Sequence, residues 1–121
     1  MKSALLPLLF LSQFAFAGLK ISKIIGIGAV LEVAADKSIR VADVVPGSPA
    51  ETGGVQKNDI IQTVQKDPKA TIVKVHGMTV EQVVALIRGP IGIDVKLTLL
   101  KPGGETKSLT IRRDEFSVQH E

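Results

Sequence analysis

Proline and glycine pairs divide this chain into short segments, and no other feature of the sequence restricts its fold as strongly. Such pairs stand at Pro46-Gly47, Gly53-Gly54 and Gly89-Pro90, and Pro-Gly-Gly occupies 102–104. Because glycine and proline interrupt both helices and strands, the segments between them can hold only short elements. The sequence therefore predicts many short strands and helices.

Several of these segments alternate apolar and polar residues, a pattern typical of strands with one face against a core. The last two strands are separated by residues 101–105, which predict a hairpin. We expect strands at residues 30–33, 38–45, 59–64, 94–100 and 106–112, and residues 71–75 can form a further short strand.

Two helices are indicated by their capping residues. Residues 48–51 read Ser-Pro-Ala-Glu, a capping box with proline at the first helical position, and a Gly-Gly pair ends that helix. Thr79 begins the second helix, Gln82 supplies the reciprocal cap, and the helix ends after about Arg88, before Gly89-Pro90.

Five to six short strands and two helices indicate an α+β fold, a small, partly open β-barrel or sandwich capped by helices. The length of 121 residues suits one domain. We expect this domain at residues 18–115 and a flexible polar tail at residues 116–121.

The first residues have the layout of a cleavable secretory signal. Lys2 supplies a positive charge, residues 5–16 are almost wholly apolar, and Ala15 and Ala17 are the small residues before a cut after Ala17. The apolar run is shorter than the roughly 20 residues of a membrane-spanning helix, and an uncleaved N-terminal anchor is the alternative. We expect a signal peptide at residues 1–17 and a soluble periplasmic or secreted protein, without cysteines for disulfides or lipid attachment.

A glycine-containing turn, Gly26-Ile27-Gly28-Ala29, precedes the first predicted strand. Because glycine permits positive φ and close backbone approach, the N–H groups of Ile27, Gly28 and Ala29 can converge into an anion-binding nest. A partly open barrel leaves one strand edge free, and a strand edge beside a helix fits one extended peptide. We predict such a groove, with the nest binding the free C-terminal carboxylate of the peptide.

The side walls of this groove follow from the strand and helix periodicities. On the strand, alternation places Ile27, Ala29 and Leu31 on one face and Val30 and Glu32 on the other. On the helix, Val83 and Leu86 share one face, and Val80, Val84 and Ile87 share another. We assign the face with Val84 to the core and the face with Val83 to the groove; the alternative is that all of them are core residues. The predicted groove residues are Val30, Leu31, Val83 and Leu86.

Other ligands are disfavoured by the same residues. The dinucleotide motif requires a third glycine followed directly by a helix, but Leu31 stands at that position and a strand follows. The basic residues are scattered and the chain has no Trp or Tyr, which disfavours nucleic acid and a charged membrane surface. We expect no cofactor and no metal.

Four stretches, in this order and spacing, resemble the PDZ domain of bacterial C-terminal processing (tail-specific) proteases. The similarity covers about residues 25–113, and the combination is more specific than any one motif. The stretches are Gly26-Ile27-Gly28-Ala29-Val30-Leu31, Val44-Val45-Pro46-Gly47-Ser48-Pro49-Ala50-Glu51, Asn58-Asp59-Ile60-Ile61 and Val83-Val84-Ala85-Leu86-Ile87-Arg88-Gly89-Pro90.

The resemblance implies a domain that recognises the apolar C-terminus of a substrate and presents it to a Ser/Lys protease domain. It also implies that the Gly-Ile-Gly-Ala loop holds the carboxylate and that Leu31 and Leu86 contact the substrate. The family usually has Gly-Asp where this chain has Asn58-Asp59. Because asparagine tolerates left-handed backbone, we expect the turn to be kept.

The protease domain of the family begins soon after the position of Arg113, so we expect the catalytic Ser and Lys to be absent and the chain not to be an enzyme. No serine stands in a nucleophile elbow or an S-x-x-K motif. Ser48 is interpreted as a helix cap, His76 as a loop residue and His120 as a tail residue.

Four functions remain open at this point. The first is an exported adaptor or regulator that binds the free C-termini of proteins. The second is a substrate-recognition subunit for a separately encoded Ser/Lys protease. The third is an envelope-assembly domain that pairs with an internal strand of a partner, and the fourth is a truncated relic.

Overall fold

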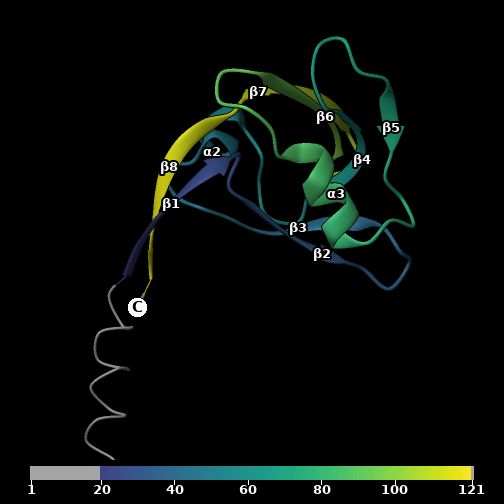
Figure 1. The fold of residues 1–121 in the computed structure, drawn as a ribbon. Coiled ribbons are helices and arrows are strands. Elements are labelled where there is room, and N and C mark those ends of the chain that lie inside the picture. Colours follow the sequence, from purple (N-terminus) through teal and green to yellow (C-terminus); the bar gives the residue numbers. More distant parts are fainter. Residues whose placement is uncertain (1–19, 121) are drawn as a thin grey trace, which may run out of the picture.

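The computed structural model describes residues 20–120 and shows a curved sheet crossed by a helix, with a narrow two-stranded ribbon at one side (Figure 1). The elements, in chain order, are β1 (Lys20–Gly26), β2 (Ala29–Val33), β3 (Ile39–Val44), α2 (Pro49–Gly53), β4 (Ile60–Gln65), β5 (Ile72–Lys74), α3 (Val80–Ile87), β6 (Asp94–Leu100), β7 (Thr106–Arg112) and β8 (Asp114–His120).

The main sheet is antiparallel, with the strand order β2-β3-β4-β6-β7, and β5 pairs with β4 outside this path. A register shift opposite Val30 and Leu31 leaves Ala42 of β3 as an extra residue, a β-bulge, and a second shift lies between Ile61 and Thr63 in β4. An open antiparallel sheet with two helices confirms the predicted α+β class. The predicted 101–105 hairpin is also confirmed, because Lys101 N–H donates to the carbonyl of Glu105 at 2.8 Å.

The core lies between the concave side of this sheet and α3. In β6 the alternation is complete: Val95, Leu97 and Leu99 are fully buried, whereas Lys96 is exposed. Burial of each such side chain contributes about 1.5–3 kcal/mol. The other fully buried apolar residues come from several elements and include Ile39, Val41, Ala50, Ile61, Val64, Val75 and Val83.

Both helices begin at the predicted caps. The Ser48 side chain accepts from the N–H of Glu51, and Gly54 ends α2 in the left-handed conformation at φ 102°. At α3, Thr79 Oγ1 accepts from Gln82 N–H at 3.1 Å, and Gln82 Oε1 accepts from Thr79 N–H at 3.0 Å. The turn at Asn58 also matches expectation, since its φ of 77° is left-handed.

Two buried charged side chains join distant parts of the fold. Lys101 Nζ lies 2.6 Å from Oδ2 of the fully buried Asp59 and donates to the carbonyl of Gly54. Arg113, only 1 % exposed, donates to the carbonyls of Ile87 at 2.6 Å, Lys66 at 2.7 Å and Ile93 at 3.3 Å. Arg113 therefore connects the end of α3 to the β4–β5 loop.

The ends of the described chain depart from the sequence-based expectation. Residues 116–121 were expected to form a flexible tail, but the chain up to His120 belongs to β8, which pairs with β1 along its whole length. This pairing joins residues that are 88 (Gly26–Asp114) to 100 (Lys20–His120) positions apart, so no local sequence signal predicts it. The predicted signal peptide at residues 1–17 lies outside the described residues.

Between residues 20 and 120 no helix is long and apolar enough to cross a membrane. In the same part of the chain, no three His, Asp or Glu side chains gather in a group that could hold a metal ion.

Candidate functional site

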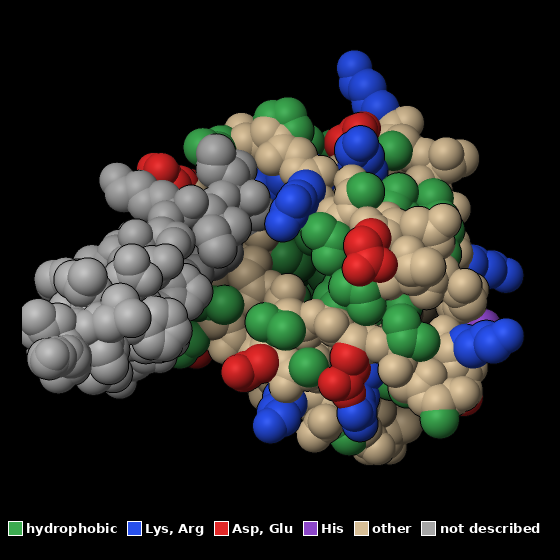
Figure 2. Space-filling model, turned by 60° about the horizontal axis from the view of Figure 1, so that its bottom comes forward, with side chains coloured by type: hydrophobic (Ala, Val, Ile, Leu, Met, Phe, Trp, Pro, Cys, Tyr) green, Lys and Arg blue, Asp and Glu red, His purple; other side chains and the backbone are tan. Residues whose placement is uncertain are grey.

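Strand β2 is one of the edge strands of the main sheet. In the described part of the chain it pairs with β3 on one side only, and α3 packs next to it (Figure 1). On the side of the molecule that is lowest in Figure 1, hydrophobic side chains gather around a hollow (Figure 2). An unpaired edge beside a helix provides backbone donors and acceptors on one wall and side chains on the other.

The turn before β2 is held in place by hydrogen bonds that its carbonyl groups accept from neighbouring segments. The Ile27 carbonyl accepts from Ala50 N–H at 2.7 Å, and the Gly28 carbonyl accepts from Val45 N–H at 2.9 Å. Gly28 has a φ of 87°, which is the left-handed conformation that favours glycine. The N–H groups of Ile27 and Gly28 donate to no backbone carbonyl within the described residues.

The Ala29 N–H completes this set. Because Val45 bonds to Gly28, the pair Ala29–Val44 is of the non-hydrogen-bonded type, and the N–H and C=O of Ala29 point away from β3 towards the free edge. Within the described residues, these three consecutive N–H groups at the start of the edge strand therefore have no partner carbonyl. That they hold a carboxylate stays a prediction.

The side chains of β2 alternate as expected. Ala29 and Leu31 are half-buried and pack against the core, as does the preceding Ile27, which is 3 % exposed. Val30 lies on the opposite face and is 49 % exposed. Ala29 and Leu31 thus share the face of β2 that is directed to α3, and Val30 projects outward beside the free edge.

The comparisons with known proteins agree with this geometry. The sequence model of the PDZ domain matches residues 18–100. The chain belongs to the PDZ-domain family. Its PDZ domain is 39 % identical over 94 residues to the carboxy-terminal processing protease CtpA of Bacillus subtilis, and 37 % identical over 95 residues to a probable CtpA-like serine protease of Staphylococcus haemolyticus.

Each of these matches covers 78 % of this chain but only 18–19 % of the relative, so the chain spans less than a fifth of the length of these proteases. A solved PDZ domain from the carboxy-terminal protease of Vibrio cholerae, in complex with a peptide, is 33 % identical. It superposes with a TM-score of 0.70 and covers 78 % of this chain and 98 % of the solved one.

Within this PDZ domain the helix faces differ from the prediction. Val83, predicted to line the groove, is fully buried in the core next to Ile87, and Leu86 is half-buried against the core. Val80 and Val84 are half-buried but are not among the residues that pack against the core cluster. The assignment of Val83 to the groove was therefore wrong, and Val80 and Val84 are the apolar helix residues that remain outside the core cluster.

The physical reason is that α3 is apolar on two adjacent faces. Its sequence, VEQVVALI, has one valine pair at Val80 and Val84 and a second i,i+4 pair at Val83 and Ile87. Spacing identifies both pairs as apolar stripes. Which stripe enters the core depends on how the helix is rotated against the sheet, and that rotation is a tertiary property.

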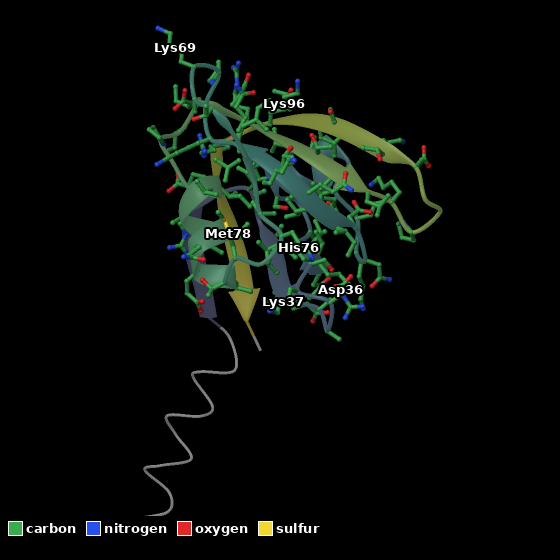
Figure 3. All side chains as sticks on the ribbon, turned by 90° about the vertical axis from the view of Figure 1, so that its right-hand side faces the viewer. Asp36, Lys37, Lys69, His76, Met78 and Lys96 are labelled. Carbon is green, nitrogen blue, oxygen red and sulfur yellow. The ribbon has the colours of Figure 1, made fainter. Side chains whose placement is uncertain are left out.

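At the other end of β2 the PDZ domain has a clasp that the sequence did not indicate. We use the word for the contacts between the β2–β3 turn and the loop before α3 (Figure 3). His76 Nε2 lies 2.8 Å from the carbonyl of Asp36, and Gly77 N–H donates to the carbonyl of Lys37 at 3.0 Å. Only the position of His76 in a loop was predicted.

The carboxylate of Asp36 is engaged inside this turn. It accepts from the Oγ of Ser38 at 2.6 Å and from the N–H of Ser38 at 3.0 Å. These hydrogen bonds, with a smaller contribution from nearby His76, lower the pKa of Asp36 below its ordinary value of 3.8.

Proposed function

We propose that this PDZ domain binds the free, apolar C-terminus of other proteins by adding it as a strand to β2. One observation carries the proposal: β2 is an unpaired edge that starts at three N–H groups with no partner from the adjacent strand. Edge pairing supplies hydrogen bonds to the peptide backbone, and the N–H groups at the turn supply a place for the terminal carboxylate.

The chemistry of the groove favours an apolar terminal residue. Ala29 is small and half-buried at the start of the strand, and Val84 stands on the helix beside the groove. The Vibrio cholerae PDZ domain, which is 33 % identical, was solved with a peptide bound. The related proteases are named for processing carboxyl termini.

The affinity should be moderate. Hydrogen bonds to a charged carboxylate contribute about 1.5–3 kcal/mol each, and one buried apolar side chain adds about 1.5–3 kcal/mol. Loss of freedom on association costs about 4–15 kcal/mol. The balance favours a micromolar dissociation constant, which corresponds to a binding free energy of about −8 kcal/mol.

The test is a fluorescence-anisotropy titration of residues 18–121 with labelled peptides ending in Leu-Ala-Ala or Val-Val. Each peptide is measured as the free acid and as the C-terminal amide. We expect micromolar binding of the acid that weakens at least about tenfold on amidation, because the amide loses a charge-assisted interaction. Equal binding of acid and amide would contradict recognition of a free terminus and would indicate pairing with an internal segment.

A pair of variants locates the binding site. Val84→Glu adds a charge on the helix face beside the groove and should abolish binding of the free acid. Ile72→Glu is the matched control, because Ile72 is a 61 % exposed apolar residue on β5, which pairs with β4 and not with β2. Loss of binding in both variants, or in neither, would place the peptide elsewhere.

The cellular role that we propose is that of an exported adaptor or regulator acting in the periplasm or outside the cell. The support is the signal-like sequence of residues 1–17. Recovery of an exported protein whose first residue is Gly18 would agree with it. Retention in the cytoplasm, or an intact N-terminus in the membrane, would contradict it.

A second role is favoured by the relatives, which are proteases five times longer than the matched region. In that role the chain selects substrates for a Ser/Lys protease on a separate polypeptide. Affinity purification of the exported protein distinguishes the two roles, since only the second requires a protease of this class to be recovered.

A further inference from the structure

The clasp closes the end of the groove that lies farthest from the carboxylate nest. Strand β2 runs from Ala29 to Val33 and is followed by the turn that contains Asp36 and Lys37. Lys37 and Gly77 are joined through their backbones, and Gly77 lies two residues before Thr79, the cap of α3. The turn therefore links the strand wall of the groove to the beginning of its helix wall.

Lys37 occupies this position in a constrained conformation. Its φ of 70° is left-handed, which is uncommon for a residue with a side chain. Two contacts, at Asp36 and at Lys37 itself, hold the turn against the loop before α3. The backbone that carries the lysine is thus fixed, and its side chain is exposed (Figure 3).

Lys37 is an exposed cation at this end of the groove, and among the described residues it forms no ion pair. Two carboxylates lie nearby and remain charged. That of Asp36 accepts hydrogen bonds from Ser38, and that of Glu32 is paired with Arg40. Glu81 of α3 lies roughly opposite the buried Val83 on the helix and is exposed.

The register of a bound peptide follows from the length of β2. A peptide whose carboxylate lies at Gly28 and Ala29 runs antiparallel to β2, because its end meets the start of the strand. Antiparallel strands pair residue by residue, so the five residues of β2 face about the last five residues of the peptide. The next residues upstream reach the turn that carries Lys37.

We propose that Lys37 makes the groove selective for proteins with an acidic residue about five or six positions before their free C-terminus. This inference rests on the proposed function and adds a second specificity element to it. The ligand class is then a C-terminal segment whose last residue is apolar and whose fifth or sixth residue from the end, roughly, is negatively charged.

The test uses three labelled peptides that end in Leu-Ala-Ala and differ only at the fifth and sixth residues from the terminus, which are Glu-Glu, Gln-Gln or Lys-Lys. An exposed ion pair of this kind changes affinity modestly, so we expect the Glu-Glu peptide to bind about three- to tenfold more tightly than the Lys-Lys peptide at low salt. The difference in affinity between these two peptides should become smaller in about 0.5 M sodium chloride, because salt screens the charges.

Charge reversal assigns the effect to one residue. In Lys37→Glu the order of the peptides should invert, and in Lys37→Gln the difference should disappear. Lys107→Glu is the matched control: it causes the same change in net charge on β7, at the opposite edge of the sheet from β2, and should leave the order unchanged. Thermal melting of each variant verifies that the domain is folded.

Equal affinities for the three peptides in the wild type would overturn the inference, and so would a preference that persists in Lys37→Glu. The amidated Glu-Glu peptide separates this failure from failure of the proposed function. If amidation weakens binding but the charge of the upstream residues does not change it, only the proposed role of Lys37 is contradicted. If amidation has no effect, recognition of the free C-terminus is contradicted, and so is the selectivity that rests on it.

Discussion

The guanidinium of Arg113 leaves no room for a side chain at position 89. A Cβ atom added to Gly89 would lie 2.7–2.9 Å from the guanidinium atoms, a distance that requires something to move. An arginine side chain can normally yield, but this one is buried and donates to three backbone carbonyls. Moving it would remove this donor from the carbonyls of Ile87 and Lys66.

Gly89→Ala should therefore destabilise the domain by about 1–3 kcal/mol, the usual cost of overpacking a well-packed site. The measurement is urea unfolding followed by circular dichroism. Gly103→Ala is the matched control, because an added Cβ at Gly103 meets nothing within 4 Å and should change stability by less than about 0.5 kcal/mol. Equal stability of the two variants would mean that Arg113 has room to rearrange.

Ser38 determines the acidity of Asp36. The hydrogen bonds from Ser38 hold the pKa of Asp36 below 3.8. A carboxyl whose pKa is lowered in the folded state contributes stability above its unfolded pKa and loses that contribution as the pH falls through its folded pKa. The contribution of Asp36 is therefore present above about pH 4 and is lost in more acidic solution.

Ser38→Ala removes the Oγ donor and keeps the backbone N–H. We expect the pKa of Asp36 to rise towards its ordinary value, and the stability that depends on this carboxylate to diminish. An NMR titration of the Asp36 side chain measures the change, with the exposed Ser108→Ala as control. An unchanged pKa would show that the backbone N–H alone produces the shift.

At the scale of the element, α3 depends on its N-terminal cap. The helix has only eight residues, from Val80 to Ile87, too few to be stable alone. Its capping box satisfies two backbone N–H groups through Thr79 and Gln82. Because Val80 and Val84 stand on this helix, the cap also fixes one wall of the groove.

Thr79→Ala should lower the free energy of unfolding by about 1 kcal/mol. Peptide affinity should fall as well, because the first turn of α3 frays more readily without the cap. Chemical unfolding and peptide titration of the same variant measure both effects, and Thr106→Ala at the exposed start of β7 serves as control. Loss of stability with full affinity would separate the cap from the groove.

At the scale of the whole molecule, the fold consists of a main sheet with a large core and a separate ribbon, β1–β8. Isolated two-stranded ribbons are marginally stable in water, whereas inner strands over a core open only with global unfolding. The amides of Lys20–Gly26 and Asp114–His120 should therefore exchange with deuterium faster than those of β4 and β6. Equal protection would indicate that the ribbon is stabilised by another surface.

Much of this architecture could be predicted because its signals are local. Ser48 and Thr79 determine where two helices begin through contacts within one turn. Asn58 adopts the left-handed conformation that its short polar side chain tolerates, and Gly28 adopts the one that glycine favours. Strand alternation correctly placed Ala29 and Leu31 on one face.

The remaining features depend on contacts between residues far apart in the chain. The sequence of α3 offers two apolar stripes, and only packing against the sheet selects Val83 and Ile87 for the core and leaves Val80 and Val84 beside the groove. Arg113 and its exposed neighbour Arg112 are the same residue type at adjacent positions, so the local sequence does not distinguish them. Arg113 is buried because its guanidinium donates to carbonyls of residues 20 to 47 positions away. Local signals by themselves determined most elements of the main sheet, both helices and the glycine turn before β2. The tertiary structure decided which face of α3 enters the core and formed the clasp and the β1–β8 ribbon, because the rotation of a helix and the meeting of distant segments are set by long-range packing.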